Sequence, residues 1–288
     1  MATPLSASQL LKALRDEGLK VVEHRNWRTH NRNHKGAWGP VHGVMIHHTV
    51  TSGTSNSVEL CYNGHADLPG PLCHGVIAKD GTVYLVGNGR ANHAGLGDDD
   101  VLRAVIAEQP LPPDNEANTD GNARFYGFEC INLGDGKDPW PAAQLEAIER
   151  AAAAICRAHG WNERSVIGHL EWQPGKIDPK GFSMNTMRER VRKRLAGAPG
   201  GPAPEPEYEP FPGASFFREG QVSPIITAMG ERLVEEGCSR YQVGPGPRWT
   251  EADRQSYAAW QRKCGFSGSD ADGIPGEVSW NRLRVPRS

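Results

Sequence analysis

The segment Val44-Met45-Ile46-His47-His48-Thr49-Val50 decides how the rest of the chain can be interpreted. Its apolar and β-branched residues predict a buried strand. Successive side chains of a strand point to opposite faces, so only one of the two histidines can face a given site. Neutral imidazole is a common zinc ligand. We therefore expect this strand to carry one histidine, His47 or His48, to a metal site.

A second segment, Gly168-His169-Leu170-Glu171-Trp172-Gln173-Pro174-Gly175-Lys176-Ile177-Asp178-Pro179, supplies further ligands. A short apolar strand, Val166-Ile167, precedes it and would deliver His169 to its C-terminal end. Proline and glycine let the loop fold back, so His169 and Asp178 can reach one ion. Three protein ligands leave a fourth position for water, which is typical of a catalytic zinc site. Lys176 would lie near the metal, able to stabilise negative charge on a tetrahedral intermediate.

Glu129 stands inside an otherwise apolar predicted strand, residues 125–131. A buried carboxylate is costly unless it faces a polar cavity. Zinc lowers the pKa of bound water to roughly 7, and the proton released needs an acceptor. Glu129 is therefore the candidate general base.

Each of these assignments has a simpler alternative. A histidine on a strand is often a hydrogen-bonded core residue, and Asp178 before a proline is often only a turn residue. Lys176 could be a solvated loop charge, and Glu129 could pair with an arginine. The residues by themselves leave the zinc site a hypothesis.

The composition restricts the class of protein. The chain has 288 residues and a formal net charge of −2, which gives no indication of nucleic acid binding, and we expect none. No apolar run approaches the roughly 18 residues of a membrane span, so no membrane insertion is expected. The first residues lack a secretory signal pattern. The 6 cysteines form no CxxC pair, so we expect a reduced, cytosolic chain, although Cys61–Cys73 or Cys238–Cys264 could pair outside the cell.

The pattern of the first part predicts strands with helices between them. Residues 76–86 are expected to form a hairpin, in which Asp80-Gly81 supplies the positive φ angles of a type I′ turn. Pro141 is expected to open a long helix that ends before Gly160. We therefore expect an α/β fold with a central mixed sheet flanked by helices. Shorter helices are expected over residues 8–17 and 188–195.

A proline- and glycine-rich stretch, residues 197–212, predicts a linker between residues 1–196 and residues 213–288. The second part has apolar residues at helical spacing. A three-helix unit of this size can fold alone, so we expect a small all-α domain. Its helices are expected over residues 222–236, 250–264 and around Trp280 and Leu283.

Landmarks along residues 40–185 resemble those of the type 2 N-acetylmuramoyl-L-alanine amidases, which include phage lysins, muropeptide-recycling amidases and peptidoglycan-recognition proteins. In that family the first zinc ligand is the first histidine after an apolar strand, which here is His47. The other landmarks are a strand pair around an Asp-Gly turn, a His-Ala-Gly element, a Gly-x-Glu strand, and Gly-His followed by Lys-x-Asp-Pro. In this chain they are His74 to Val86, His93-Ala94-Gly95, Gly127-Phe128-Glu129, Gly168-His169 and Lys176-Ile177-Asp178-Pro179.

The resemblance implies a peptidoglycan-recognition-protein-like fold and a role for each matched residue. Zinc would be bound by His47, His169 and Asp178, and catalysis would use Glu129 and Lys176. His93 would line the substrate groove, with a purely structural role as the alternative.

Two positions depart from the pattern of many phage members. Those members have cysteine as the third ligand, where this chain has Asp178. They also have a tyrosine where this chain has Cys73, just before His74. Glu129 instead resembles the glutamate of the recycling branch. We expect Cys73 to be a packed thiol rather than a spare ligand.

The second part resembles a small three-helix peptidoglycan-binding domain. The resemblance rests on Tyr257-x-x-Trp260-Gln261 and on Asp272-Gly273-Ile274-Pro275-Gly276, followed by Ser279-Trp280 and Leu283. It implies that Trp260 and Trp280 contact the polymer. The alternative is a helical stalk or dimerisation module without a ligand.

We therefore expect a monomeric, zinc-dependent enzyme that cleaves the amide bond between N-acetylmuramic acid and L-alanine in cell-wall peptidoglycan. A wall-binding module without a secretory signal suggests a phage endolysin, held in the host cytoplasm until release to the cell wall. The alternatives are a non-catalytic peptidoglycan-recognition protein and a cytosolic muropeptide-recycling amidase. The filled ligand positions argue against the first, and the tail module argues against the second.

Overall fold

The computed structural model describes residues 2–201 and 208–287. The chain divides into two compact units, Met1–Pro204 and Glu205–Ser288. The centre of the expected linker, residues 202–207, lies outside the described residues, and the domain boundaries at residues 196 and 213 stay a prediction.

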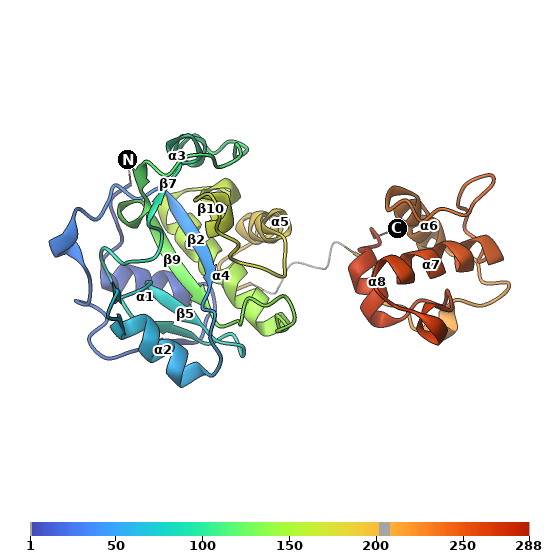
Figure 1. Ribbon diagram of the computed structural model, residues 1–288, viewed down its shortest axis with the longest axis horizontal. Coiled ribbons are helices and arrows are strands. Elements are labelled where there is room, and N and C mark those ends of the chain that lie inside the picture. The colour runs from blue at the N-terminus through green and yellow to red at the C-terminus, as the bar shows by residue number, and fades with distance from the viewer. Residues whose placement is uncertain (1, 202–207, 288) are drawn as a thin grey trace. The chain divides into compact units, whose positions relative to one another are not determined.

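A mixed sheet of 6 strands forms the centre of the first unit (Figure 1). The strand order is β1-β6-β5-β9-β2-β10; β5 and β6 run antiparallel, and the other neighbours run parallel. The expected central strand is β2 (Gly43–His48), which is buried along its whole length between two neighbours. Burial on both faces explains its nearly continuous apolar pattern. The other strands are β1 (Val21–Glu23), β5 (Gly75–Ile77), β6 (Val83–Leu85), β9 (Phe125–Cys130) and β10 (Val166–Gly168).

One face of the sheet is covered by α4 (Ala142–His159), which also packs against α1 (Ala7–Asp16) and α5 (Met184–Ala196). Pro141 precedes α4, and Gly160 ends it with a φ of 72°, as predicted. Val44 and Ile46 of β2 belong to the core under these helices.

The opposite face of the sheet is covered by α3 (Asp99–Ile106) near β2 and by α2 (Thr54–Asn63) near β5. Met45 packs there with Val101 and Val105 of α3. The sequence did not predict α2 or α3. Two short ribbons complete this unit: β3 (Gly64–His65) with β4 (Leu68–Pro69), and β7 (Leu96–Gly97) with β8 (Thr119–Asp120).

The hairpin between β5 and β6 forms as expected, but its turn type was predicted wrongly. A type I′ turn needs positive φ at both central residues. Gly81 has a φ of 82°, whereas Asp80 is not among the residues with positive φ. Gly81 N–H donates to Ala78 O, and Ala78 N–H donates to Thr82 O. The carboxylate of Asp80 accepts the backbone N–H and hydroxyl of Thr82, which fixes a longer loop with one left-handed glycine.

The second unit is a helical unit with its own core, as predicted. Its helices in the described residues are α6 (Pro224–Glu235), α7 (Glu251–Lys263) and α8 (Glu277–Leu283). Thr250 and Asp253 form a capping box that starts α7. Gln261 of α7 accepts Gly273 N–H and donates to Ile274 O, so it fixes the Asp-Gly turn before α8.

The expected fold class is thus confirmed: a mixed sheet flanked by helices, with a separate helical unit. None of the helices in the described parts of the chain is long and apolar enough to cross a membrane. The 6 cysteines are free thiols in the structure.

Candidate functional site

His47 and Glu129 lie side by side on neighbouring parallel strands. Their Cα positions are paired in the register between β2 and β9. Because side chains alternate along β2, His47 shares the face of Met45, whereas His48 shares the α4 face with Ile46. The structure therefore directs His47, and not His48, toward the site.

His169 begins a short 3-10 helix, η4 (His169–Glu171), directly after β10. The carboxylate of Glu171 accepts Gly168 N–H at 3.0 Å and is paired with the guanidinium of Arg188 on α5. Arg188 also donates to Val166 O at 3.0 Å. These bonds fix the end of β10, so that the His169 side chain leaves the strand toward His47.

The loop that carries Asp178 folds back, as predicted. Its return is fixed by the bond from Leu170 N–H to Asp178 O, at 2.7 Å. Lys180 N–H donates to His48 Nδ1 at 3.2 Å, so the second histidine of the strand holds the loop rather than an ion.

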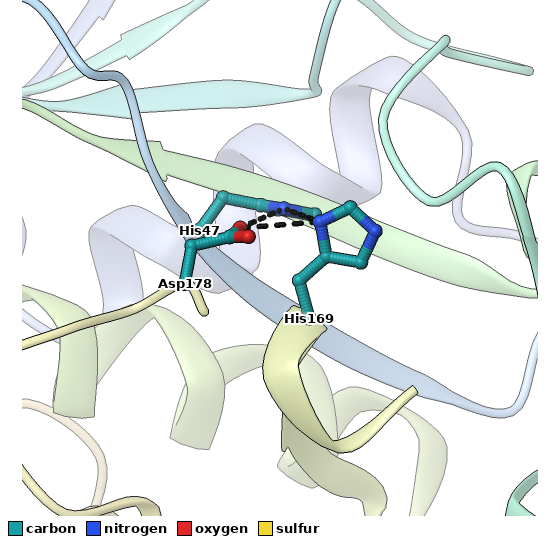
Figure 2. A group of neighbouring side chains, drawn as sticks. All are labelled: His47, His169 and Asp178. Atoms are coloured by element: carbon teal, nitrogen blue, oxygen red, sulfur yellow. Dashed lines mark hydrogen bonds and ion pairs between the residues drawn. The ribbon is translucent and has the colours of Figure 1, made fainter. Parts of the chain in front are cut away.

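The three predicted ligands converge on one point (Figure 2). His47 Nδ1 lies 3.1 Å from His169 Nδ1 and 3.0 Å from Asp178 Oδ2, and His169 Nδ1 lies 3.1 Å from the same oxygen. Among the histidine, cysteine and acidic side chains of the described residues, these three are arranged so that they could hold a metal ion. Two ligands of a tetrahedral zinc ion lie roughly 3.3 Å apart when each is about 2.0–2.1 Å from the metal.

The donor set fits zinc on chemical grounds as well. Burial lowers the pKa of His47 to about 4, so its ring is neutral near pH 7. Burial opposes ionisation of Asp178, but the rings of His169 and His47 outweigh that effect and hold its pKa below its ordinary value. Neutral imidazole and carboxylate oxygen are the ligands of catalytic zinc sites, and three of them leave one position open.

Glu129 faces this site without a hydrogen-bond partner for its buried Oε2 among the described residues. Burial raises its pKa to about 8, and the negative charge of Asp178 acts in the same direction. The charge of Lys176, whose side chain is exposed, lowers the pKa of both Glu129 and His47. The carboxyl group of Glu129 is therefore poised to exchange a proton beside the predicted ligands.

His93 is buried beside His47. Only 9% of it is exposed, and both ring nitrogens are used inside the protein. Nδ1 lies 3.0 Å from His47 Nε2, and Nε2 lies 3.0 Å from Phe125 O. It packs behind His47 rather than along an open groove, so the groove prediction stays untested and the contact favours the structural alternative.

Gln173 is a contact that the sequence did not predict. Its Oε1 lies 3.3 Å from Nε2 of His169, four residues before it. The sequence offered one indication, because Gln173 lies in the loop between His169 and Asp178. That spacing alone does not predict that its side chain touches that of His169.

Trp260 and Trp280 were predicted to contact the polymer, and the structure places both in the core instead. Their exposed fractions are 7% and 1%. The Trp260 indole N–H donates to Ser279 O, and that of Trp280 donates to Glu209 O. An indole with its ring packed and its N–H paired inside the protein presents no surface to a polymer. The aromatic motif is a packing motif.

Cys73 is a packed thiol, as expected. It is fully buried in the core cluster with Cys61, and burial raises its pKa well above the ordinary value. It lies outside the group of the three ligands.

The solved structures that match this chain share little sequence identity with it. An endolysin N-acetylmuramoyl-L-alanine amidase of Clostridium intestinale is 17% identical over 60% of this chain and 95% of that one, with a TM-score of 0.41. The hydrolase AmiA of Staphylococcus aureus is 12% identical over 67% and 93%, with a TM-score of 0.41. A Drosophila peptidoglycan recognition protein, PGRP-SA, is 18% identical over 52% and 80%, with a TM-score of 0.32. No curated protein matches the sequence.

A family match covers the site. Residues 37–181, about half of the 288 residues, match the family described as N-acetylmuramoyl-L-alanine amidase. This range contains His47, Glu129, His169 and Asp178. The chain therefore belongs to the N-acetylmuramoyl-L-alanine amidase family, as its landmarks predicted.

Proposed function

We propose that this protein is a zinc-dependent amidase that cleaves the bond between N-acetylmuramic acid and L-alanine in peptidoglycan. The observation that carries the proposal is the convergence of His47 Nδ1, His169 Nδ1 and Asp178 Oδ2 at separations of 3.0–3.1 Å, with Glu129 paired to His47 across the strands. A zinc ion held by these atoms would polarise the substrate carbonyl and lower the pKa of a water molecule.

Glu129 has the place and chemistry of the proton carrier. Its carboxylate would take a proton from water as the water oxygen bonds to the amide carbon. It would then give that proton to the leaving nitrogen as the carbon–nitrogen bond breaks. The products are the lactyl carboxylic acid and a free alanine amine. One water molecule is consumed for each amide bond cleaved.

Lys176 would act on the charge that develops during this reaction. The carbonyl oxygen becomes negative when the water oxygen adds, and a nearby ammonium group stabilises it. The positive charge of Lys176 lowers the pKa of Glu129 and of His47, which supports a position of Lys176 near the reacting atoms.

The test is a digestion of isolated cell walls by the full chain, with and without a chelator. New N-terminal alanine and new reducing sugar are followed together. We expect alanine amines to appear without reducing ends, and to be lost with the chelator and in His169→Ala and Asp178→Ala. Reducing ends would indicate a glycosidase, and no product at all would indicate the alternative of a non-catalytic binder.

We further propose that the second unit anchors the enzyme on the wall, as in an endolysin that reaches peptidoglycan from the host cytoplasm. Tethering raises the effective concentration of a catalytic unit on an insoluble polymer. The burial of Trp260 and Trp280 supports a binding surface elsewhere in this unit. A hollow of about 510 Å³ between the loop before α7 and its first turn is lined by Arg240, Tyr241 and Arg248, among others.

Sedimentation of the full chain with walls tests this anchoring role. Arg240→Ala with Arg248→Ala is expected to leave more protein in the supernatant. Arg232→Ala with Arg262→Ala removes two positive charges from α6 and α7 outside this hollow and is the charge-matched control. Equal sedimentation of all three proteins would contradict this site.

A further inference from the structure

We propose that His93 is a positioning residue that fixes the tautomer of His47, so that the Nδ1 lone pair of His47 points at the metal position. The inference rests on the proposed zinc site. It concerns a residue that touches neither the ion nor the substrate, and it follows from a chain of hydrogen bonds that begins at the backbone of β9.

The direction of each bond is set by Phe125 O, because a carbonyl oxygen can only accept. His93 Nε2 lies 3.0 Å from this oxygen and must carry the ring proton. A neutral imidazole has one N–H, so His93 Nδ1 is an acceptor. His47 Nε2 lies 3.0 Å from it and must therefore donate. His47 Nδ1 is left unprotonated.

Without this chain, the proton of His47 would be drawn to the wrong nitrogen. Asp178 Oδ2 lies 3.0 Å from His47 Nδ1 and would favour a proton there in the metal-free protein. With that tautomer, His47 Nε2 and Phe125 O would both be acceptors for the single N–H of His93, and one of them would lose its donor. A buried carbonyl without a donor is costly, so the carbonyl biases both rings.

The structure holds His93 firmly in this role. Its backbone N–H and that of Ala94 both donate to Asn122 Oδ1, at 2.8 Å each. Its ring is nearly perpendicular to that of His47, at 88°, with 5.2 Å between the centroids. The His-Ala-Gly element is thereby fastened to the segment just before β9.

Gly127 supplies the space for the ring. A Cβ added at Gly127 would lie 2.5 Å from His93 Nδ1, a separation that Cβ atoms essentially never show. The strand conformation of β9 does not itself require glycine. The glycine of Gly127-Phe128-Glu129 is thus explained by the His93 ring that lies against it.

Partners of this kind orient a ligand and raise its affinity for the metal, and their loss commonly costs about 10–100-fold in metal affinity. The two zinc-binding histidines differ here. His169 has the side-chain amide of Gln173 at 3.3 Å, on a partly exposed loop, whereas His47 has a buried ring tied to backbone.

The test compares His93→Asn with His93→Leu in the full chain. The two side chains have nearly the same shape, but only asparagine offers an acceptor near the position of Nδ1. Zinc affinity is measured by competition with a chromogenic chelator. We expect about a 10–100-fold loss in His93→Leu and a clearly smaller loss in His93→Asn. Equal losses in both variants, or none in either, would overturn the inference.

An NMR measurement tests this inference independently of the proposed function. Long-range proton–nitrogen NMR of the metal-free protein reports which ring nitrogen of His47 carries the proton. We expect Nε2 in the natural protein and a shift toward Nδ1 in His93→Leu. A proton on Nδ1 in the natural protein would refute the inference. If the chain binds no zinc, the proposed function fails, and this measurement still decides the tautomer.

Discussion

At the scale of single residues, the site combines groups found from sequence with groups that only the fold reveals. His47, His169 and Asp178 were predicted as ligands, and the structure brings their side chains together. The place of His93 could not be predicted, because it depends on how the loop after Gly89 packs over β9. Trp260 was predicted to contact the polymer because aromatic residues at helical spacing do not distinguish a binding face from a buried face. Here Trp260 and Tyr257 lie on the buried face of α7.

Glu129→Gln tests the proton carrier. The amide keeps the shape of the side chain but cannot accept a proton from water. We expect turnover on cell walls to fall by about 10²–10⁴-fold. Zinc affinity should change little, because Glu129 is not among the converging ligands. Glu116→Gln, at an exposed loop position of the same unit, is the control and should be neutral. Turnover near that of the natural protein would remove Glu129 from the mechanism.

Gly127→Ala tests the packing of the His93 ring. The added Cβ would displace the ring, and we expect weaker zinc binding together with a loss of about 1–3 kcal/mol in the free energy of unfolding. Gly197→Ala is the control, because a Cβ there would meet Arg194 O at an ordinary 3.6 Å. Chelator competition and denaturant unfolding measure the two quantities. Unchanged zinc affinity in Gly127→Ala would contradict the packing argument.

At the scale of elements, strands with apolar runs and helices with clear ends were predictable. The expected strand at residues 44–50 is β2, and the helix after Pro141 is α4. By contrast, α2 begins with Thr54-Ser55-Asn56-Ser57, residues that also favour turns and caps, so it has no clear apolar stripe. The hairpin turn was wrong in type because the side chain of Asp80 stabilises its own loop.

The segment before β5 predicts how stability depends on pH. His74 accepts Gly127 N–H at Nδ1 and donates to Gly89 O from Nε2. Burial lowers its pKa to about 4, against about 6.5 in an unfolded chain. Between these values the unfolded state binds more protons, so the free energy of unfolding falls as the pH is lowered. We expect His74 to lower the free energy of unfolding by roughly 3 kcal/mol between pH 7 and about pH 4, where the loss is complete.

Two measurements check this. Denaturant unfolding of the metal-free protein should give lower stability at pH 4.5 than at pH 7. The ring signals of His74 in NMR should stay at their neutral positions down to about pH 5. A ring that titrates near pH 6.5 would contradict the buried, doubly bonded state.

At the scale of the whole molecule, the two units have separate cores. The proposed zinc ligands, Glu129 and Lys176 all lie in the first unit. The sequence indicated this division through its composition, whereas the surface that the second unit uses could not be inferred from its aromatic motif.

Trp280→Ala tests the structural role of that indole. We expect the second unit to lose about 3–5 kcal/mol of stability, because a large buried side chain is removed. Hydrolysis of a soluble muropeptide by the first unit should be unaffected. Calorimetry and a soluble-substrate assay measure these effects. A stable second unit that merely binds walls less well would instead restore the predicted contact role.

The most direct measurement of the central claim is zinc K-edge X-ray absorption of the purified, zinc-loaded protein. The account predicts one zinc per chain, with a first shell of nitrogen and oxygen atoms only, at about 2.0–2.1 Å, including two imidazoles. It also predicts that this shell is lost in Asp178→Ala. A sulfur atom at about 2.3 Å, or a protein that binds no zinc, would contradict the site built from His47, His169 and Asp178.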